Sequence, residues 1–103
     1  MSRPTYDGEQ TAVDADGNIL REWDGVVLVR ELVATAPGNC EVMPATIPAG
    51  TRATAITLLD ADKGLFDLEC YLDAGGDIYA FAHGVGGDVR VVERIEDKKA
   101  VEI

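Results

Sequence analysis

The stretch from Ile47 to Leu72 constrains the fold most, because it contains two strand-like segments on either side of a turn. Proline, glycine and aspartate mark turns at 48–50 and 60–64, so strands are expected at Thr51–Leu59 and Leu65–Leu72. Side chains alternate in the second strand, with Phe66, Leu68, Cys70 and Leu72 on one face and Asp67, Glu69, Tyr71 and Asp73 on the other. This alternation predicts a β-hairpin with one buried face.

Further strands are expected on both sides of this hairpin. Gln10–Val13 and Asn18–Trp23 flank an Asp-Gly step, which is typical of a tight hairpin turn. Val26–Leu32 begins with four apolar residues, so both of its faces should be covered, and the N-terminal hairpin that contains Trp23 is the nearest candidate to cover one. Ile78–His83 and Val89–Ile95 follow, separated by a glycine-rich break.

The segment Val33–Pro48 is the longest irregular piece of the chain. Its prolines exclude a helix, although Glu41–Met43 could pair briefly within it. An ordered loop of this length is often functional, and a plain surface excursion is an equal alternative.

These elements predict an all-β protein built as a small antiparallel barrel of five to six strands with an added N-terminal β-hairpin. At 103 residues the chain forms one domain, 1–103. The expected divisions are an arm at 1–9, the N-terminal hairpin at 10–23, the barrel at 24–95 and a tail at 96–103.

The order of these pieces resembles the SH3-like small β-barrel, in which a long first loop, three meandering strands and a short break precede the last strand. The segments Pro48-Ala49-Gly50-Thr51-Arg52-Ala53-Thr54-Ala55-Ile56 and Phe66-Asp67-Leu68-Glu69-Cys70 are similar to the G-T-x-G-T-V-V and Y-E-V-E-F pattern of bacterial SH3-like domains of unknown function. Ala53 stands where those domains have glycine, and Cys70 where they have an aromatic residue. The resemblance covers about residues 24–95 and implies a fold, with no functional residues. Because 33–48 contains no aromatic residue, the peptide groove of eukaryotic SH3 domains is not expected.

The net charge of −10 limits the partners of the protein. Such an excess of acids repels nucleic acid and anionic membrane surfaces. It is compatible with a protein partner that has a basic surface, although solubility alone is the more common reason for such a charge. No apolar run is long enough for a membrane span, and Met1–Tyr6 does not resemble a secretory signal, so a cytoplasmic location is expected.

The sequence indicates neither a cofactor nor a metal site. Cys40 and Cys70 are too few for zinc, and a disulfide between them is disfavoured in a reducing compartment. Asp14, Asp16 and Asn18 match the first ligand positions of an EF-hand, but Ile19 and Gly25 then occupy positions that require Gly and Glu. A turn is therefore expected at 14–17.

Catalysis is not expected either. His83 is the only histidine and lies at a strand end among apolar neighbours, where packing is its usual role. A pairing of Cys70 with His83, and a divalent ion held by the carboxylates of 67–77, are conceivable alternatives with little support.

A non-catalytic protein-binding module of bacterial or phage origin, acting through loop 33–48 or a barrel edge, is the predicted function. The first alternative is an acidic phage-type inhibitor, of the anti-CRISPR or anti-restriction kind, that mimics phosphate on a nucleic-acid-binding protein. The second is a small enzyme subunit that uses His83. The candidate partner-binding residues are Asp60, Asp62, Asp67, Glu69, Asp73, Asp77, Cys40, Glu41 and Met43.

Two surface features are also expected. The aspartate-rich turns at 14–17, 60–64 and 73–77 would form an acidic rim if they fell at one end of the barrel. Ile78, Ala80 and Ala82 would form an apolar row that either the N-terminal hairpin or a second copy of the chain covers, so a homodimer has even odds.

Overall fold

The hairpin predicted within 47–72 is the centre of the fold. In the computed structural model, which describes residues 12–94, it comprises β6 (Arg52–Asp60) and β7 (Leu65–Tyr71). Gly64 ends the connecting turn with φ of +67°, a conformation that glycine adopts without strain. Phe66, Leu68 and Cys70 are completely buried, as the alternation predicts. Leu72 lies beyond the end of β7 and is 37% exposed, so its predicted place in the core was wrong.

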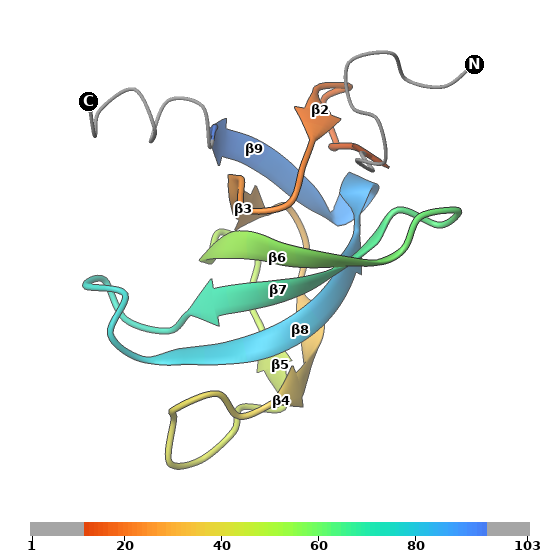
Figure 1. Cartoon of the computed structure of the whole chain (residues 1–103). Coiled ribbons are helices and arrows are strands. Elements are labelled where there is room, and N and C mark those ends of the chain that lie inside the picture. The colour runs from red at the N-terminus through yellow and green to blue at the C-terminus, as the bar shows by residue number, and fades with distance from the viewer. Residues whose placement is uncertain (1–11, 95–103) are drawn as a thin grey trace.

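Seven strands form one antiparallel sheet in the order β5-β4-β8-β7-β6-β3-β9. Figure 1 shows β6, β7 and β8 side by side, with β3 and β9 beyond one edge of this group and β4 and β5 beyond the other. The other strands of this sheet are β3 (Gly25–Leu28), β4 (Leu32–Ala36), β5 (Thr46–Ile47), β8 (Tyr79–Val85) and β9 (Val89–Glu93), and the 3₁₀ turn η1 (Gly86–Asp88) connects β8 to β9. This curled sheet with its N-terminal hairpin confirms the predicted all-β barrel class, with seven strands in place of five to six.

The sheet curls because β6 takes part in both of its halves. Its first residues pair with β3, whereas almost its whole length pairs with β7. The register between β6 and β7 shifts after Ala55 and again after Leu58. Such bulges bend a strand and increase its twist, which allows the long strand β6 to curl with the sheet.

The predicted single strand 26–32 is two strands. The chain turns at 29–31, where the Val29 N–H donates to the Asp88 carbonyl at 2.9 Å and Arg30 pairs with the Asp88 carboxylate at 3.1 Å. β4 then pairs with β8 and with β5. The irregular loop is therefore only 37–45, shorter than the predicted 33–48, and 41–43 form no strand.

The row of alanines on β8 faces the interior. Ala80 and Ala82 are fully buried and stand opposite Cys70 and Leu68 of β7. The expectation that a hairpin or a second copy covers them is therefore wrong, since the core of the barrel itself does so. Ile78 precedes β8 and is 44% exposed.

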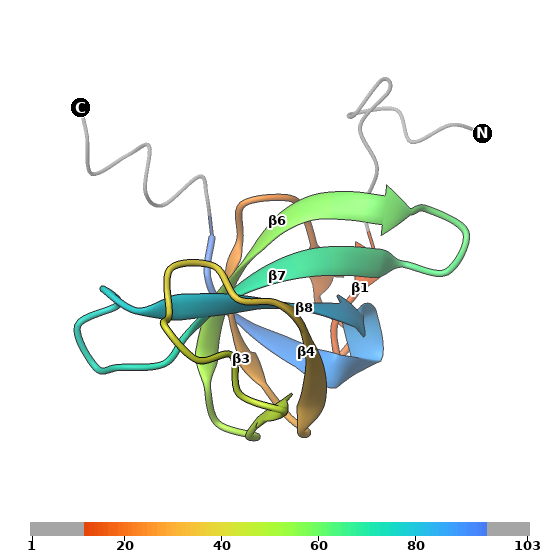
Figure 2. The same cartoon turned by 90° about the horizontal axis from the view of Figure 1, so that it is seen from below.

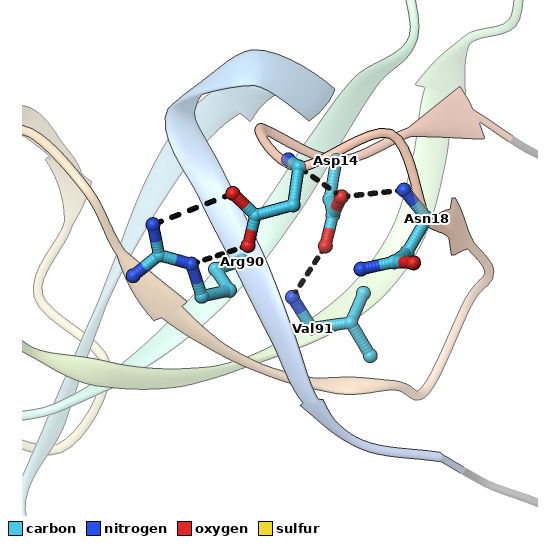
Figure 3. A network of polar contacts seen from close by, with 5 residues as sticks. Asp14, Asn18, Arg90 and Val91 are labelled. Carbon is cyan, nitrogen blue, oxygen red and sulfur yellow. Dashed lines mark hydrogen bonds and ion pairs between the residues drawn. The ribbon is translucent and has the colours of Figure 1, made fainter.

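The N-terminal hairpin consists of β1 (Ala12–Val13) and β2 (Ile19–Leu20). Leu20 is its buried anchor and belongs to the same core cluster as Val26 and Leu28 of β3, while Trp23 is 51% exposed. Figure 3 shows the turn of this hairpin beside β9, where Asp14 accepts the Val91 N–H at 2.8 Å. The Ala15 N–H donates to the Val89 carbonyl at 2.8 Å. The hairpin thus satisfies polar groups on the edge strand β9, a common protection of sheet edges. The arm 1–9, residues 10 and 11 of the predicted hairpin, Ile95 and the tail 96–103 lie outside the described residues.

Candidate functional site

The structure separates the predicted acidic residues between two ends of the barrel. Asp60 and Asp62 belong to the turn before β7, and Asp73 and Asp77 to the turn after it. The seven residues of β7, at roughly 3.3 Å each, hold these turns roughly 20 Å apart. Figures 1 and 2 show the two turns projecting in opposite directions. The expected common acidic rim is therefore wrong for these two turns.

The first of these turns lies near the N-terminal hairpin instead. A side chain at Gly64 would approach the Ala12 Cβ to 3.3 Å. The Asp60 carboxylate accepts the N–H groups of Asp62 and Lys63 at 3.0 and 3.3 Å, so this carboxylate shapes its own turn.

The second turn, 72–78, is joined to loop 37–45 by Asn39. The Asn39 side-chain amide donates to the Asp77 carbonyl at 2.7 Å and accepts the Tyr79 N–H at 2.8 Å, and the Asn39 N–H donates to the Tyr79 carbonyl at 3.3 Å. Gly38 packs so closely on Tyr79 that a Cβ there would overlap the Tyr79 carbonyl oxygen, and its φ is +59°. Asn39 therefore fixes the loop to the barrel by hydrogen bonds to backbone groups, as a short paired strand would do.

These contacts create a surface that we call the loop–turn surface. It comprises the exposed residues Glu41, Val42 and Met43 of the loop and Leu72, Asp77 and Ile78 of the turn, together with the half-buried Asp73. Val42 is 82% exposed and Met43 42%. In Figure 2 the yellow loop crosses β8 on the side from which turn 72–78 projects. Five of the nine predicted residues, namely Cys40, Glu41, Met43, Asp73 and Asp77, therefore belong to this side of the molecule.

Asp67 and Glu69 lie between the two ends, on the outer face of β7. The Tyr71 hydroxyl donates to Glu69 at 3.0 Å and also shares a hydrogen bond with the Thr54 hydroxyl at 2.6 Å. Burial raises the pKa of Tyr71, and the Glu69 carboxylate raises it further against the Thr54 hydrogen bond. The His83 Nε2 lies 3.9 Å from the Asp67 Oδ1, and its side chain is 47% exposed. Asp67 and Glu69, both predicted to bind a partner, therefore each make a polar contact with a neighbouring side chain of the sheet.

A cavity of about 390 Å³ opens where β6 and β7 separate at the second end. Its walls are Gly50–Arg52 from the start of β6 and Tyr71–Gly76 from the end of β7 and the following turn. Of the predicted residues only Asp73 lines it. Sequence reasoning missed the cavity, because residues 50 and 74 become neighbours only when the two strands pair.

Two carboxylates that could suggest a catalytic or metal site are structural. Asp24 is completely buried, accepts the Arg21 N–H at 2.9 Å and pairs with Arg94 at 3.3 Å. Asp14 is 4% exposed and accepts the N–H groups of Asp16 and Asn18 as well as that of Val91. Asp14 therefore belongs to a turn, as the failed EF-hand pattern predicts. Within residues 12–94 no group of three or more His, Cys, Asp or Glu side chains is arranged to hold a metal ion.

The two cysteines are free thiols in different environments. Cys40 is half-buried in the loop, whereas Cys70 points into the core. Burial, assisted by the charges of Asp67 and Glu69, raises the pKa of Cys70 to about 12. Cys70 and His83 lie on opposite faces of the sheet, since Cys70 is buried and His83 belongs to the outward-facing set of β8. The conceivable pairing of these two residues is therefore wrong.

We expect a thiol reagent at pH 8 to modify Cys40 alone in the folded protein, because a buried thiol with a pKa near 12 is protonated and shielded. Reaction with an aromatic disulfide, followed by mass spectrometry, should give one adduct, and a second only in denaturant. The variant Cys40→Ser should give none until it unfolds. Rapid double labelling of the native protein would contradict this expectation.

Residues 12–94 thus define an all-β protein in which a curled seven-stranded antiparallel sheet, accompanied by the two-stranded N-terminal hairpin, carries the turns at 60–64 and 72–78 and the fixed loop 37–45. Comparison of the chain with protein-family models, with curated protein sequences and with solved structures gave no match. None of the helices formed by residues 12–94 has the length and apolar character needed to cross a membrane.

Proposed function

We propose that this protein is a non-catalytic module, built on an SH3-like small barrel, that binds one protein partner through the loop–turn surface. The order of elements supports the SH3-like assignment: a first barrel strand, a long excursion over 29–51, the meander β6-β7-β8, a 3₁₀ turn and a short last strand. The free cysteines support a reducing compartment such as the cytosol.

The observation that carries the proposal is an ordered loop with exposed apolar side chains. Asn39 and Gly38 fix loop 37–45 on the barrel, yet Val42 and Met43 remain in solvent. A preorganised loop loses little conformational entropy when it binds, and exposed methionine adapts to the shape of a partner. Apolar side chains beside Asp73 and Asp77 fit a partner with an apolar centre and a basic rim.

The loop is a better candidate than a barrel edge. On β9, the Val89 carbonyl and the Val91 N–H are already bonded to the N-terminal hairpin. The opposite edge strand, β5, has only two residues. Addition of a partner strand requires a longer run of unpaired backbone groups.

The arrangement of acids along β7 favours the phosphate-mimic inhibitor as a second candidate. Asp60 and Asp62 precede the strand, Asp67 and Glu69 lie on its outer face roughly 7 Å apart, and Asp73 follows it. These acids therefore occur along the whole length of β7 and in the turns at both of its ends. Their contacts with backbone N–H groups, His83 and Tyr71 also give them a structural explanation.

An affinity pull-down from a bacterial lysate tests the two candidates. We expect a partner to remain bound at about 1 M salt, where interactions between exposed charges are screened. The double variant Val42→Ser, Met43→Ser should lose this partner. The matched control Asp60→Asn, Asp62→Asn, at the opposite end of β7, should retain it.

A different result distinguishes the alternative. If the partner leaves with salt or with added DNA, and the control variant loses it as well, phosphate mimicry replaces the loop–turn proposal. If the wild-type chain and the loop variant retain the same proteins, the loop–turn surface is not the binding site.

A further inference from the structure

The cavity at the open end of the β6–β7 hairpin has the composition of a binding site. Its volume of about 390 Å³ lies at the lower end of the range of roughly 300–1,000 Å³ found for small-ligand pockets, which suits one or two amino-acid residues. The Tyr71 ring and Leu72 form part of the wall. Gly75 and Gly76 leave the backbone of the turn uncovered.

Arg52 is unusual among the arginines of this acidic chain. Arg30, Arg90 and Arg94 pair with Asp88, Asp16 and Asp24. Within residues 12–94 the Arg52 guanidinium has no ion pair or hydrogen bond, although it lines the cavity and is exposed. A guanidinium binds a carboxylate through two parallel N–H bonds, so Arg52 is a ready receptor for that group.

The opposite wall carries negative charge. Asp73 belongs to this wall, and its Oδ2 lies 4.0 Å from the position that a Cβ would take at Gly75. The Asp77 Oδ2 lies 3.3 Å from the same position, beside the cavity and outside its lining. Asp73 uses its Oδ1 to accept the Ile78 N–H at 3.0 Å, which orients the carboxylate. This wall attracts a cation, whose aliphatic stem could lie along Tyr71.

From this arrangement we infer that the cavity binds a peptide carboxyl terminus whose last residue is lysine or arginine. The terminal carboxylate pairs with Arg52, and the basic side chain extends to Asp73 and Asp77. A ligand of this class carries both charges that the walls require, and its side-chain cation is drawn by the net negative charge of the protein. This site goes beyond the proposed function, because it can be occupied whether or not loop 37–45 holds a partner.

Titration of the full-length, ¹⁵N-labelled protein with acetyl-Gly-Gly-Lys tests the inference. We expect saturable shifts of the amide signals of 50–52 and 71–76, with a dissociation constant on the order of 1 mM for so small a ligand. The same peptide with a carboxyl-terminal amide should bind at least about tenfold more weakly, and so should a peptide with leucine in place of lysine.

Variants locate the site. Arg52→Gln should weaken binding of the free acid about tenfold or more and remove its preference over the amide. Arg30→Gln, a matched change outside the cavity, should bind as the wild type does, and so should the loop variant Val42→Ser, Met43→Ser, which separates this test from that of the proposed function. Equal binding of acid and amide, unchanged binding by Arg52→Gln, or no saturable shift at about 10 mM peptide would each overturn the inference.

Discussion

Replacing Gly86 with alanine is expected to detach the N-terminal hairpin from the barrel and to lower the free energy of unfolding by about 2–3 kcal/mol. Gly86 is buried at the start of η1, where the backbone of β1 passes directly over it. A Cβ at this position would overlap the Val13 carbonyl oxygen. Because that atom belongs to the backbone, no side-chain rotation can relieve the overlap, and β1 must move.

The neighbouring glycine provides a matched control. A Cβ at Gly87 meets no heavy atom within 4 Å, so Gly87→Ala should leave the stability almost unchanged. Urea unfolding gives the two free energies, and amide hydrogen exchange reports the hairpin directly. In Gly86→Ala the Ala15 and Val91 N–H groups should exchange faster, since both are bonded across the contact between hairpin and barrel. Equal stability of the two variants would show that the hairpin docks in some other way.

Replacing Asp14 with alanine should cost about 2–4 kcal/mol of unfolding free energy, because the carboxylate accepts three backbone N–H groups and a single hydrogen bond to a charged group contributes about 1.5–3 kcal/mol. The loss should be largest at Val91, whose N–H would face a cavity in place of an acceptor (Figure 3). Asp16→Ala is the control. It removes an exposed ion pair with Arg90 and should change the stability little.

The effect of Asp14 should also depend on pH. Burial by itself would raise the pKa of Asp14, but the hydrogen bonds from Val91, Asn18 and Asp16 outweigh it and lower the pKa below 3.8. The carboxylate therefore stabilises the fold fully above 3.8, and this contribution disappears as the pH falls through the lowered value. Urea unfolding between pH 5 and 2 should show a steeper acid destabilisation for the wild type than for Asp14→Ala. Parallel pH profiles would contradict the role assigned to Asp14.

Sequence patterns correctly predicted the elements that depend on residues close together in the chain. The alternation from Phe66 to Cys70 places these side chains in the core, and the Asp-Gly turn before Ile19 forms as expected. The error at Leu72 has a local cause too, since the pattern continues after the strand has ended. Trp23 lies at a turn with φ of +75°, which its residue type does not indicate, and Leu20 is the side chain of the hairpin that enters the core.

Hydrogen-bond partners that lie far away in the sequence could not be predicted. Asn39 recognises the backbone 38 and 40 residues away, and Asp14 that of Val91 77 residues away. Nothing in the residue types identifies those partners, because any backbone N–H or carbonyl can fill the role. The sequence does not distinguish Arg52 from other arginines, because the cavity that it lines forms only when the strands pair and Tyr71–Gly76 provides the opposite wall.

The amino-acid sequence alone is enough to predict the all-β class, the central hairpin and its one buried face, because side-chain periodicity and turn residues act between near neighbours. It also sets the net negative charge of the protein, to which any partner must be complementary. The tertiary structure alone decided the division of the acids between two ends, the splitting of 26–32 at Asp88, and the burial of the alanine row. These features depend on which strands pair, and that pairing joins residues far apart in the sequence along the whole curled sheet.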